Sequence, residues 1–95
     1  MEIELIGKQH EVVCDWYEGK LMMREFTVGG YTNWRLPRVE ELVRLSFIEN
    51  DCALSSYWSS DEYDGSAFQY SFATGVLARR VKDGIACCRA VRDVE

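Results

Sequence analysis

The feature that most constrains the fold of this sequence is one short amphipathic helix, predicted over residues 38–47. Pro37 precedes it and fixes the backbone where a helix can begin. Apolar residues then recur at the i, i+3, i+4 spacing of a single helix face. They are Val39, Leu42, Val43 and Phe47. Glu40 and Glu41 fall in the first turn, where the helix dipole favours negative charge. The rest of the chain has to supply the surface on which this helix packs.

Most of the remaining chain has the pattern of β-strands, because β-forming or alternating segments are separated by turn signals. The expected strands are residues 2–5, 11–17, 21–28, 57–60, 67–72, 76–81 and 85–91. Residues 21–25 are equally compatible with a helical turn. Residues 61–66 are predicted to form a polar loop, and Lys82-Asp83-Gly84 is predicted to close a hairpin. We therefore expect an α+β fold, a twisted antiparallel sheet with one short amphipathic helix.

Length and composition limit the classes of protein to consider. The 95 residues, 47% of them apolar, are expected to form one domain over residues 1–95. The net charge of −5 argues against a nucleic-acid binder, which needs a basic face. No apolar run is long enough to span a membrane, and the N-terminus lacks the features of a signal peptide. We expect a cytoplasmic protein with no membrane or nucleic-acid partner, and the sequence leaves its oligomeric state open.

The cysteines Cys14, Cys52, Cys87 and Cys88 leave three interpretations open. The adjacent Cys87 and Cys88 would point to opposite faces of a strand, so they cannot share one partner region. No Cys-x-x-Cys motif occurs and His10 is the only histidine, which argues against a structural zinc site. Buried, reduced thiols are favoured because free cysteine is often buried. One disulfide and a metal site are the alternatives.

Three motifs occur in one order along the chain. They are Gly-Tyr-Thr-Asn-Trp-Arg-Leu-Pro at residues 30–37, Tyr-Trp-Ser-Ser at residues 57–60 and Cys-Arg-Ala-Val-Arg at residues 88–92. The chain resembles, over about residues 19–92, the C-terminal domain family of Legionella collagen-like proteins, a family of largely unassigned function. The resemblance implies a C-type-lectin-like fold. Family members commonly carry a further helix before the first motif, and this chain leaves little room for it, so we expect a reduced version of the fold.

The motif residues Trp34, Arg35, Trp58 and Arg92 are expected to hold the fold together. Each tryptophan offers a large apolar face and one N–H group that needs an acceptor. Each arginine carries a planar fork of five donors, which suits a carboxylate or several loop carbonyls. These residues are therefore predicted to be structural.

No catalytic set can be assembled from the sequence. His10 lies in a polar turn, and no base is identifiable beside Ser59 or Ser60. Residues 61–65 include carboxylates that could bind calcium, but they lack the spacing of an EF-hand loop. The sequence therefore predicts a protein that is not an enzyme and that has no metal or cofactor.

We expect a recognition module that binds another protein. Binding residues concentrate on loops of a rigid scaffold, and residues 50–56 and 61–66 are the longest segments without periodicity. The predicted binding residues are aromatic anchors and acids that would steer a basic partner. They are Tyr57, Tyr63, Asp61, Glu62 and Asp64. Phage-encoded inhibitors of host defence, such as anti-CRISPR proteins, belong to this size class. The alternative is a lectin-like domain that binds a glycan or a small molecule through exposed aromatic side chains.

Overall fold

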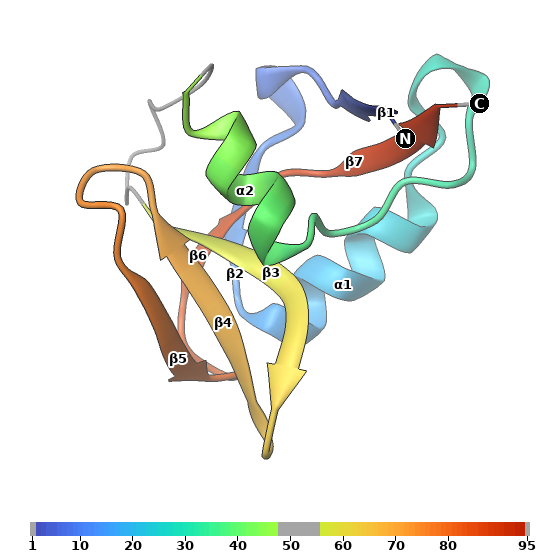
Figure 1. Ribbon diagram of the computed structural model, residues 1–95. Helices are drawn as coiled ribbons and strands as arrows, with labels where there is room; N and C mark the ends of the chain where they lie inside the picture. Colours follow the sequence, from blue (N-terminus) through green and yellow to red (C-terminus); the bar gives the residue numbers. More distant parts are fainter. Residues whose placement is uncertain (1, 48–55, 95) are drawn as a thin grey trace.

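The structure, a computed structural model, describes residues 2–47 and 56–94 and has an α+β architecture (Figure 1). Its strands are β1 (Glu2–Leu5), β2 (Val12–Cys14), β3 (Ser56–Tyr63), β4 (Ser66–Ser71), β5 (Leu77–Val81), β6 (Ala86–Cys88) and β7 (Val91–Val94). Its helices are α1 (Trp16–Glu25) and α2 (Val39–Leu45), with short 3-10 turns at Lys8–His10 and Val28–Gly30. The α+β class predicted from the sequence is therefore confirmed.

The strands form two sheets rather than one. The larger sheet has the order β2-β6-β3-β4-β5, and β1 pairs with β7 in a separate two-stranded sheet. All pairs are antiparallel except that of β3 with β6, which is parallel. The expectation of a purely antiparallel sheet was wrong because β6 enters between β2 and β3, a pairing of distant segments that local patterns do not report.

The two helices lie against the larger sheet and contact different pairs of strands. Helix α1 contacts β2 and β3, whereas α2 contacts β3 and β4. Adjacent strand residues point to opposite faces, and Tyr57 and Trp58 accordingly belong to two different core clusters. Trp58 packs in the cluster that includes Trp16 of α1, and Tyr57 packs in the cluster that includes Leu42 of α2.

Helix α2 lies within the range predicted from the sequence, and its ends have clear causes. The helix begins at Val39, two residues after Pro37. The Asp61 carboxylate accepts a hydrogen bond from the Val39 N–H at 2.8 Å. Such a carboxylate satisfies a donor that the first helical turn leaves open. Leu42 and Leu45 are buried against the sheet. The helix prediction over residues 38–47 is therefore confirmed, two residues too long at the C-terminal end.

Helix α1 corrects two expectations, namely a strand over residues 21–28 and a fold with a single helix. A reciprocal capping box begins it: the Asp15 carboxylate accepts from the Glu18 N–H at 2.8 Å, and the Glu18 carboxylate accepts from the Asp15 N–H. Gly19 lies inside the helix, where an added Cβ would be 2.4 Å from the Cys88 Sγ. The glycine therefore permits close packing. The strand predicted at residues 11–17 is shortened to β2.

The C-terminal segment corrects two further expectations. Residues 85–91 do not form one strand, because β6 pairs in the larger sheet and β7 pairs with β1. Lys82-Asp83-Gly84 does turn, with the Val81 carbonyl accepting from the Gly84 N–H at 3.1 Å. However, β5 and β6 are not paired, so the turn starts a crossing to another part of the sheet rather than closing a hairpin.

Candidate protein-recognition surface

The acidic segment predicted as a loop over residues 61–66 is mostly strand. Strand β3 continues to Tyr63, and β4 begins at Ser66. Only Asp64 and Gly65 turn the chain, with φ values of 50° and 80°. This two-residue hairpin is short because Asp and Gly tolerate the positive φ that such turns require. The expectation of a long, irregular acidic loop was therefore wrong.

The three acids of this segment have different environments. Asp61 caps α2 through its carboxylate. Glu62 forms an ion pair with Lys82, whose ammonium lies 4.4 Å from the centre of the Trp16 ring. Asp64 is exposed at the hairpin turn. Asp61 and Glu62 are thus engaged within the protein, which reduces the charge that these acids could offer to a basic partner.

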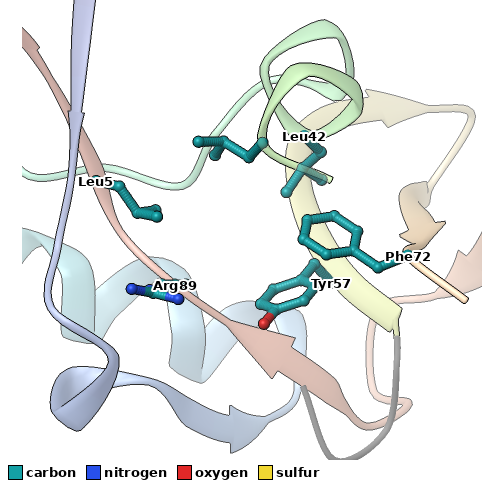
Figure 2. Close-up of a pocket in the computed structure, with 6 residues that line it drawn as sticks. Leu5, Leu42, Tyr57, Phe72 and Arg89 are labelled. Carbon is teal, nitrogen blue, oxygen red and sulfur yellow. The ribbon is translucent and has the colours of Figure 1, made fainter. Parts of the chain in front are cut away.

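Tyr57 lies in the interior, so it cannot be the predicted surface anchor. It is 2% exposed, its hydroxyl donates to the Glu11 carboxylate at 2.6 Å, and its ring centre is 4.4 Å from that of Phe72. Figure 2 shows these two rings facing a gap that Leu42 and Arg89 also line. The gap has a volume of about 10 Å³, enough for about one water molecule. Predicted binding residues 50–55 lie outside the described residues.

Tyr63, in contrast, lies on an exposed apolar surface. The strand register places Tyr63 opposite Ser66, and Phe68 opposite Arg79. Residues opposite each other in a sheet share a face, so the side chains of β3, β4 and β5 form one continuous area. We call this area the β5 patch. It consists of Tyr63, Phe68, Leu77, Arg79 and Val81.

The β5 patch lies beside the area that α2 covers, since α2 packs on β3 and β4. Tyr70 and Phe72 of the same face pack against the cluster that contains Leu42 of α2. On β5 and near the hairpin turn the side chains of this face are exposed: Tyr63 is 61%, Leu77 46% and Val81 66% exposed. In Figure 1, α2 lies over one end of β3 and β4, while their hairpin extends away from it. An apolar surface with large exposed side chains is a common mark of an interaction site.

Arg79 adds charge to the β5 patch. Its guanidinium lies 5.0 Å from the centre of the Tyr63 ring, a cation–π arrangement. A cation–π contact does not use the N–H groups of the guanidinium as hydrogen-bond donors to another residue. Within residues 2–47 and 56–94, neither Arg79 nor its neighbour Arg80 forms an ion pair. Both arginines are exposed and can pair with acids of a partner.

The motif tryptophans and Arg92 occupy structural positions. The Trp34 indole donates to the Val28 carbonyl at 3.1 Å, and the Trp58 indole donates to the Cys14 carbonyl at 3.1 Å. Both rings are buried. They therefore cannot serve as stacking surfaces for a sugar. Arg92 pairs with Glu4 across β1 and β7 and lies over the Tyr31 ring.

Arg35 links three parts of the chain. Its guanidinium contacts both carboxylate oxygens of Glu41 in α2, at 2.8 and 2.9 Å, and a carboxylate oxygen of Asp93 in β7 at 2.8 Å. Hydrogen bonds from Arg35 are the main cause that lowers the pKa of Glu41 and the pKa of Asp93. The Glu41 carboxylate also accepts from the Arg38 N–H at 2.7 Å, at the start of α2. This network fixes the helix relative to β7.

The network predicts an acid-labile contribution to stability. The pKa of Glu41 is lowered from its ordinary value of 4.5 by Arg35, so its contribution is complete above pH 4.5 and is lost as the pH falls through the lowered pKa. We expect the melting temperature to fall below about pH 4.5, and to fall less steeply in Arg35→Met, which lacks the guanidinium. Thermal unfolding followed by circular dichroism at pH 3 to 7 tests this. Equal slopes in both proteins would contradict it.

The described nucleophilic side chains Ser59, Cys14 and Cys88 are buried, and Cys87 is oxidised. Ser59 is fully buried, and its hydroxyl donates to the Phe68 carbonyl at 2.9 Å. Cys14 and Cys88 are free thiols with Sγ atoms 3.4 Å apart, and burial raises the pKa of both, which disfavours the nucleophilic thiolate. Cys87 takes part in a disulfide, an alternative that the sequence left open. Among the described residues, no three His, Cys, Asp or Glu side chains converge to hold a metal ion.

Four of the five β5 patch residues were not predicted as binding residues. Phe68 stood out in the alternation of residues 67–72, and Arg79 belonged to the most basic run of the sequence. The missing information was on which strands of the sheet α2 packs. That depends on packing between distant segments.

Comparisons with known proteins leave the family of this chain open. No protein-family model matches it, and a search of curated proteins gives no match. In the described part of the chain, no helix is both long and apolar enough to cross a membrane. Function is therefore inferred from the geometry of the β5 patch.

Proposed function

We propose that this protein is a non-catalytic recognition module that binds another protein through the β5 patch. The observation that carries the proposal is the exposure of Tyr63, Leu77 and Val81 on one face of the sheet, near the end of β3 and along the edge strand β5. Aromatic residues and arginine dominate the binding energy of protein interfaces, and Arg79 stacked on Tyr63 supplies both.

The proposal changes the expected charge of the partner from basic to acidic. The acids predicted to attract a basic partner include Asp61 and Glu62, which cap a helix and pair with a lysine. The charge available at the patch is that of Arg79, and Arg80 adds a second positive charge on the other face of β5. Complementary charge mainly raises the association rate and selects the partner. An acidic binding surface on the partner is therefore expected, although this chain itself has a net charge of −5.

Several finer predictions remain part of this proposal. A C-type-lectin-like fold and the resemblance to the Legionella family are compatible with the α+β architecture, in which α1 supplies the helix before the first motif that was expected to be missing. A cytoplasmic location is compatible with the described helices. Inhibition of a host defence system, as by an anti-CRISPR protein, is one function that a binding module of this kind could serve.

The experiment places a photo-crosslinking phenylalanine derivative at Tyr63 and, as a matched control, at Tyr17. Tyr17 is 58% exposed, close to the 61% of Tyr63, but it lies on α1. Exposed to the same cell lysate, the protein labelled at Tyr63 is expected to capture a specific protein. Val81→Ser should reduce that capture about tenfold, the effect of losing one strong interface contact. Leu21→Ser, an exposed apolar change on α1, should leave it unchanged.

Capture of the same protein from position 17 alone, or capture from position 63 that Val81→Ser leaves intact, contradicts the proposal. In either case the contact surface would lie elsewhere. The far-ultraviolet circular dichroism of each variant controls for loss of fold.

The second candidate function, binding of a small hydroxylated ligand, is favoured by a polar hollow on the opposite face of β4 and β5. This hollow has a volume of about 230 Å³. It is lined by Ser56, Gln69, Ser71, Thr74, Val76, Ala78 and Arg80. Such side chains can hydrogen-bond a sugar, but the lining offers no aromatic ring on which the sugar could stack. Titration of isotope-labelled protein with monosaccharides separates the two functions, because a sugar should shift the amides of Gln69 and Ser71 rather than that of Tyr63.

A further inference from the structure

We infer that the exposed edge of β5 adds an antiparallel strand from the partner, and that this strand carries glutamate or aspartate flanked by apolar residues. The inference rests on the proposed function and specifies its partner. Strand β5 ends the order of the larger sheet, so in the described part of the chain only β4 pairs with it. An uncapped edge offers backbone donors and acceptors to an extended segment.

The register shows which backbone groups of β5 are used inside the protein. The Ser71 N–H donates to the Val76 carbonyl at 3.0 Å, so these two residues form a hydrogen-bonded pair. Such pairs recur at every second position of an antiparallel ladder. Ala78 and Arg80, opposite Gln69 and Ala67, are therefore the β5 residues whose N–H and C=O groups face β4.

The N–H and C=O groups of Leu77, Arg79 and Val81 consequently face away from β4. The Val81 carbonyl supports this assignment, because it accepts a hydrogen bond from the Gly84 N–H and not from β4. The remaining outward groups are those of Leu77 and Arg79 and the Val81 N–H. They have the two-residue spacing at which an added strand forms its bonds.

Leu77, Arg79 and Val81 also belong to the β5 patch. An added strand would therefore bond to their backbone and contact their side chains at the same time. An added residue opposite Arg79 shares its face and its charge environment, and its neighbours two positions away lie opposite Leu77 and Val81. An acidic residue opposite Arg79 and apolar residues opposite Leu77 and Val81 would match this surface. The adjacent positions point to the other face, near Arg80, where an acid is again favoured.

A second copy of this chain is a poorer occupant of the edge. Two β5 strands paired antiparallel through all three outward residues would be centred on Arg79, which would lie directly opposite the Arg79 of the copy. Like charges directly opposite each other destabilise a sheet. The arginines therefore oppose self-pairing and favour an acidic strand.

The edge at β2 differs in length and in charge. It is three residues long and has the acids Glu11 and Asp15 at its two ends. Both acids are engaged within the protein, Glu11 with Lys8 and Tyr57 and Asp15 as the cap of α1. The β2 edge therefore offers a shorter ladder and no arginine, whereas β5 offers both a longer ladder and Arg79.

The test uses a capped synthetic peptide with the central sequence valine–glutamate–glutamate–glutamate–valine and threonines on both sides. Backbone amide hydrogen exchange of the whole protein is measured by NMR with and without it. In the free protein, the Leu77 and Arg79 amides should exchange quickly and those of Ala78 and Arg80 slowly. With the peptide at about nine times its Kd, exchange at Leu77, Arg79 and Val81 should slow about tenfold.

Two control peptides separate strand addition from simple attraction. N-methylation of the central glutamate keeps every side chain but removes the donor opposite Arg79, and it should abolish the slowing. Replacement of the glutamates by lysines should do the same. The double variant Arg79→Gln/Arg80→Gln should weaken binding about three- to tenfold, whereas Arg24→Gln/Arg44→Gln, with the same change in net charge, should not.

The outcomes distinguish this inference from the proposed function. Crosslinking at Tyr63 combined with unslowed exchange at Leu77 and Arg79 overturns strand addition while leaving recognition by the β5 patch intact. Slow exchange of these amides in the free protein, together with a dimer in sedimentation, would assign the edge to a second copy and overturn the inference. Binding of the N-methylated peptide with equal affinity also overturns it.

Discussion

Trp58→Ala is expected to lower the free energy of unfolding by about 3–5 kcal/mol, as large-to-small changes of buried aromatic residues do. Trp58 is 0% exposed and belongs to the core cluster that includes Trp16 and Met23 of α1. Its removal leaves a cavity and also leaves the Cys14 carbonyl without its donor. A domain of this length has a total stability of roughly 5–14 kcal/mol. Urea unfolding followed by fluorescence and circular dichroism measures the loss.

Two further variants show whether the loss comes from the cavity. Trp58→Phe keeps much of the ring but removes the N–H donor, so its cost should be smaller, about 1–3 kcal/mol. Tyr63→Ala removes an exposed ring of the β5 patch and should change the free energy of unfolding by less than about 0.5 kcal/mol. Comparing Trp58→Ala with Tyr63→Ala thus distinguishes a residue that stabilises the core from a residue of the proposed binding surface. A stable Trp58→Ala protein would show that the core repacks around the site.

Helix α2 could be predicted because its signals are local. Pro37, the acids of the first turn and the apolar spacing all lie within one short segment. Helix α1 carried an equally local signal in Asp15 and Glu18, the ends of its capping box. That signal was outweighed by the run of β-formers around it and by Gly19, which resembled a turn residue. Only the contact of Gly19 with Cys88, far along the chain, explains why a glycine lies in the helix.

The pairing of the last two strands, β6 and β7, could not be predicted from sequence patterns. Residues 85–91 have the composition of one strand, yet Cys88 pairs with Val12 in the larger sheet and Val91 pairs with Leu5 in the smaller one. The change of sheet occurs at Arg89 and Ala90, both buried. Nothing in the local alternation indicates which distant strand each half will join.

The candidate site depended on the same kind of information. The sequence placed Phe68, Tyr70 and Phe72 on one face, and the structure agrees. Whether a residue of that face is core or surface is decided by the reach of α2. Tyr57 is therefore interior and Tyr63 exterior, although the two residues looked alike as aromatic strand residues.

Arg35→Met is expected to lower the free energy of unfolding by about 2–4 kcal/mol, although methionine retains most of the apolar stem. Glu41 is 8% exposed, and without the guanidinium its charge stays in a partly dry site with no compensating cation. Removing one partner of a buried ion pair costs about 3–5 kcal/mol, and the 27% exposure of the Arg35 side chain reduces this figure. Urea unfolding at pH 7 measures the change.

The double variant Arg35→Met/Glu41→Gln should recover part of that loss, because it removes the charge that Arg35→Met leaves unpaired. The two single changes should therefore not add, and a coupling energy of about 1–2 kcal/mol is expected for residues in one network. Asp93→Asn removes the more exposed partner of Arg35 and should cost less than about 1 kcal/mol. If the single changes add instead, Arg35 stabilises the protein through its other partners, Asp93 and the Leu36 carbonyl, and the position of α2 against β7 does not depend on the ion pair with Glu41. A coupled result would mean that Arg35 fixes the position of α2 through its ion pair with Glu41. Because α2 covers part of the sheet, Arg35 would then also affect how much of the sheet surface stays exposed.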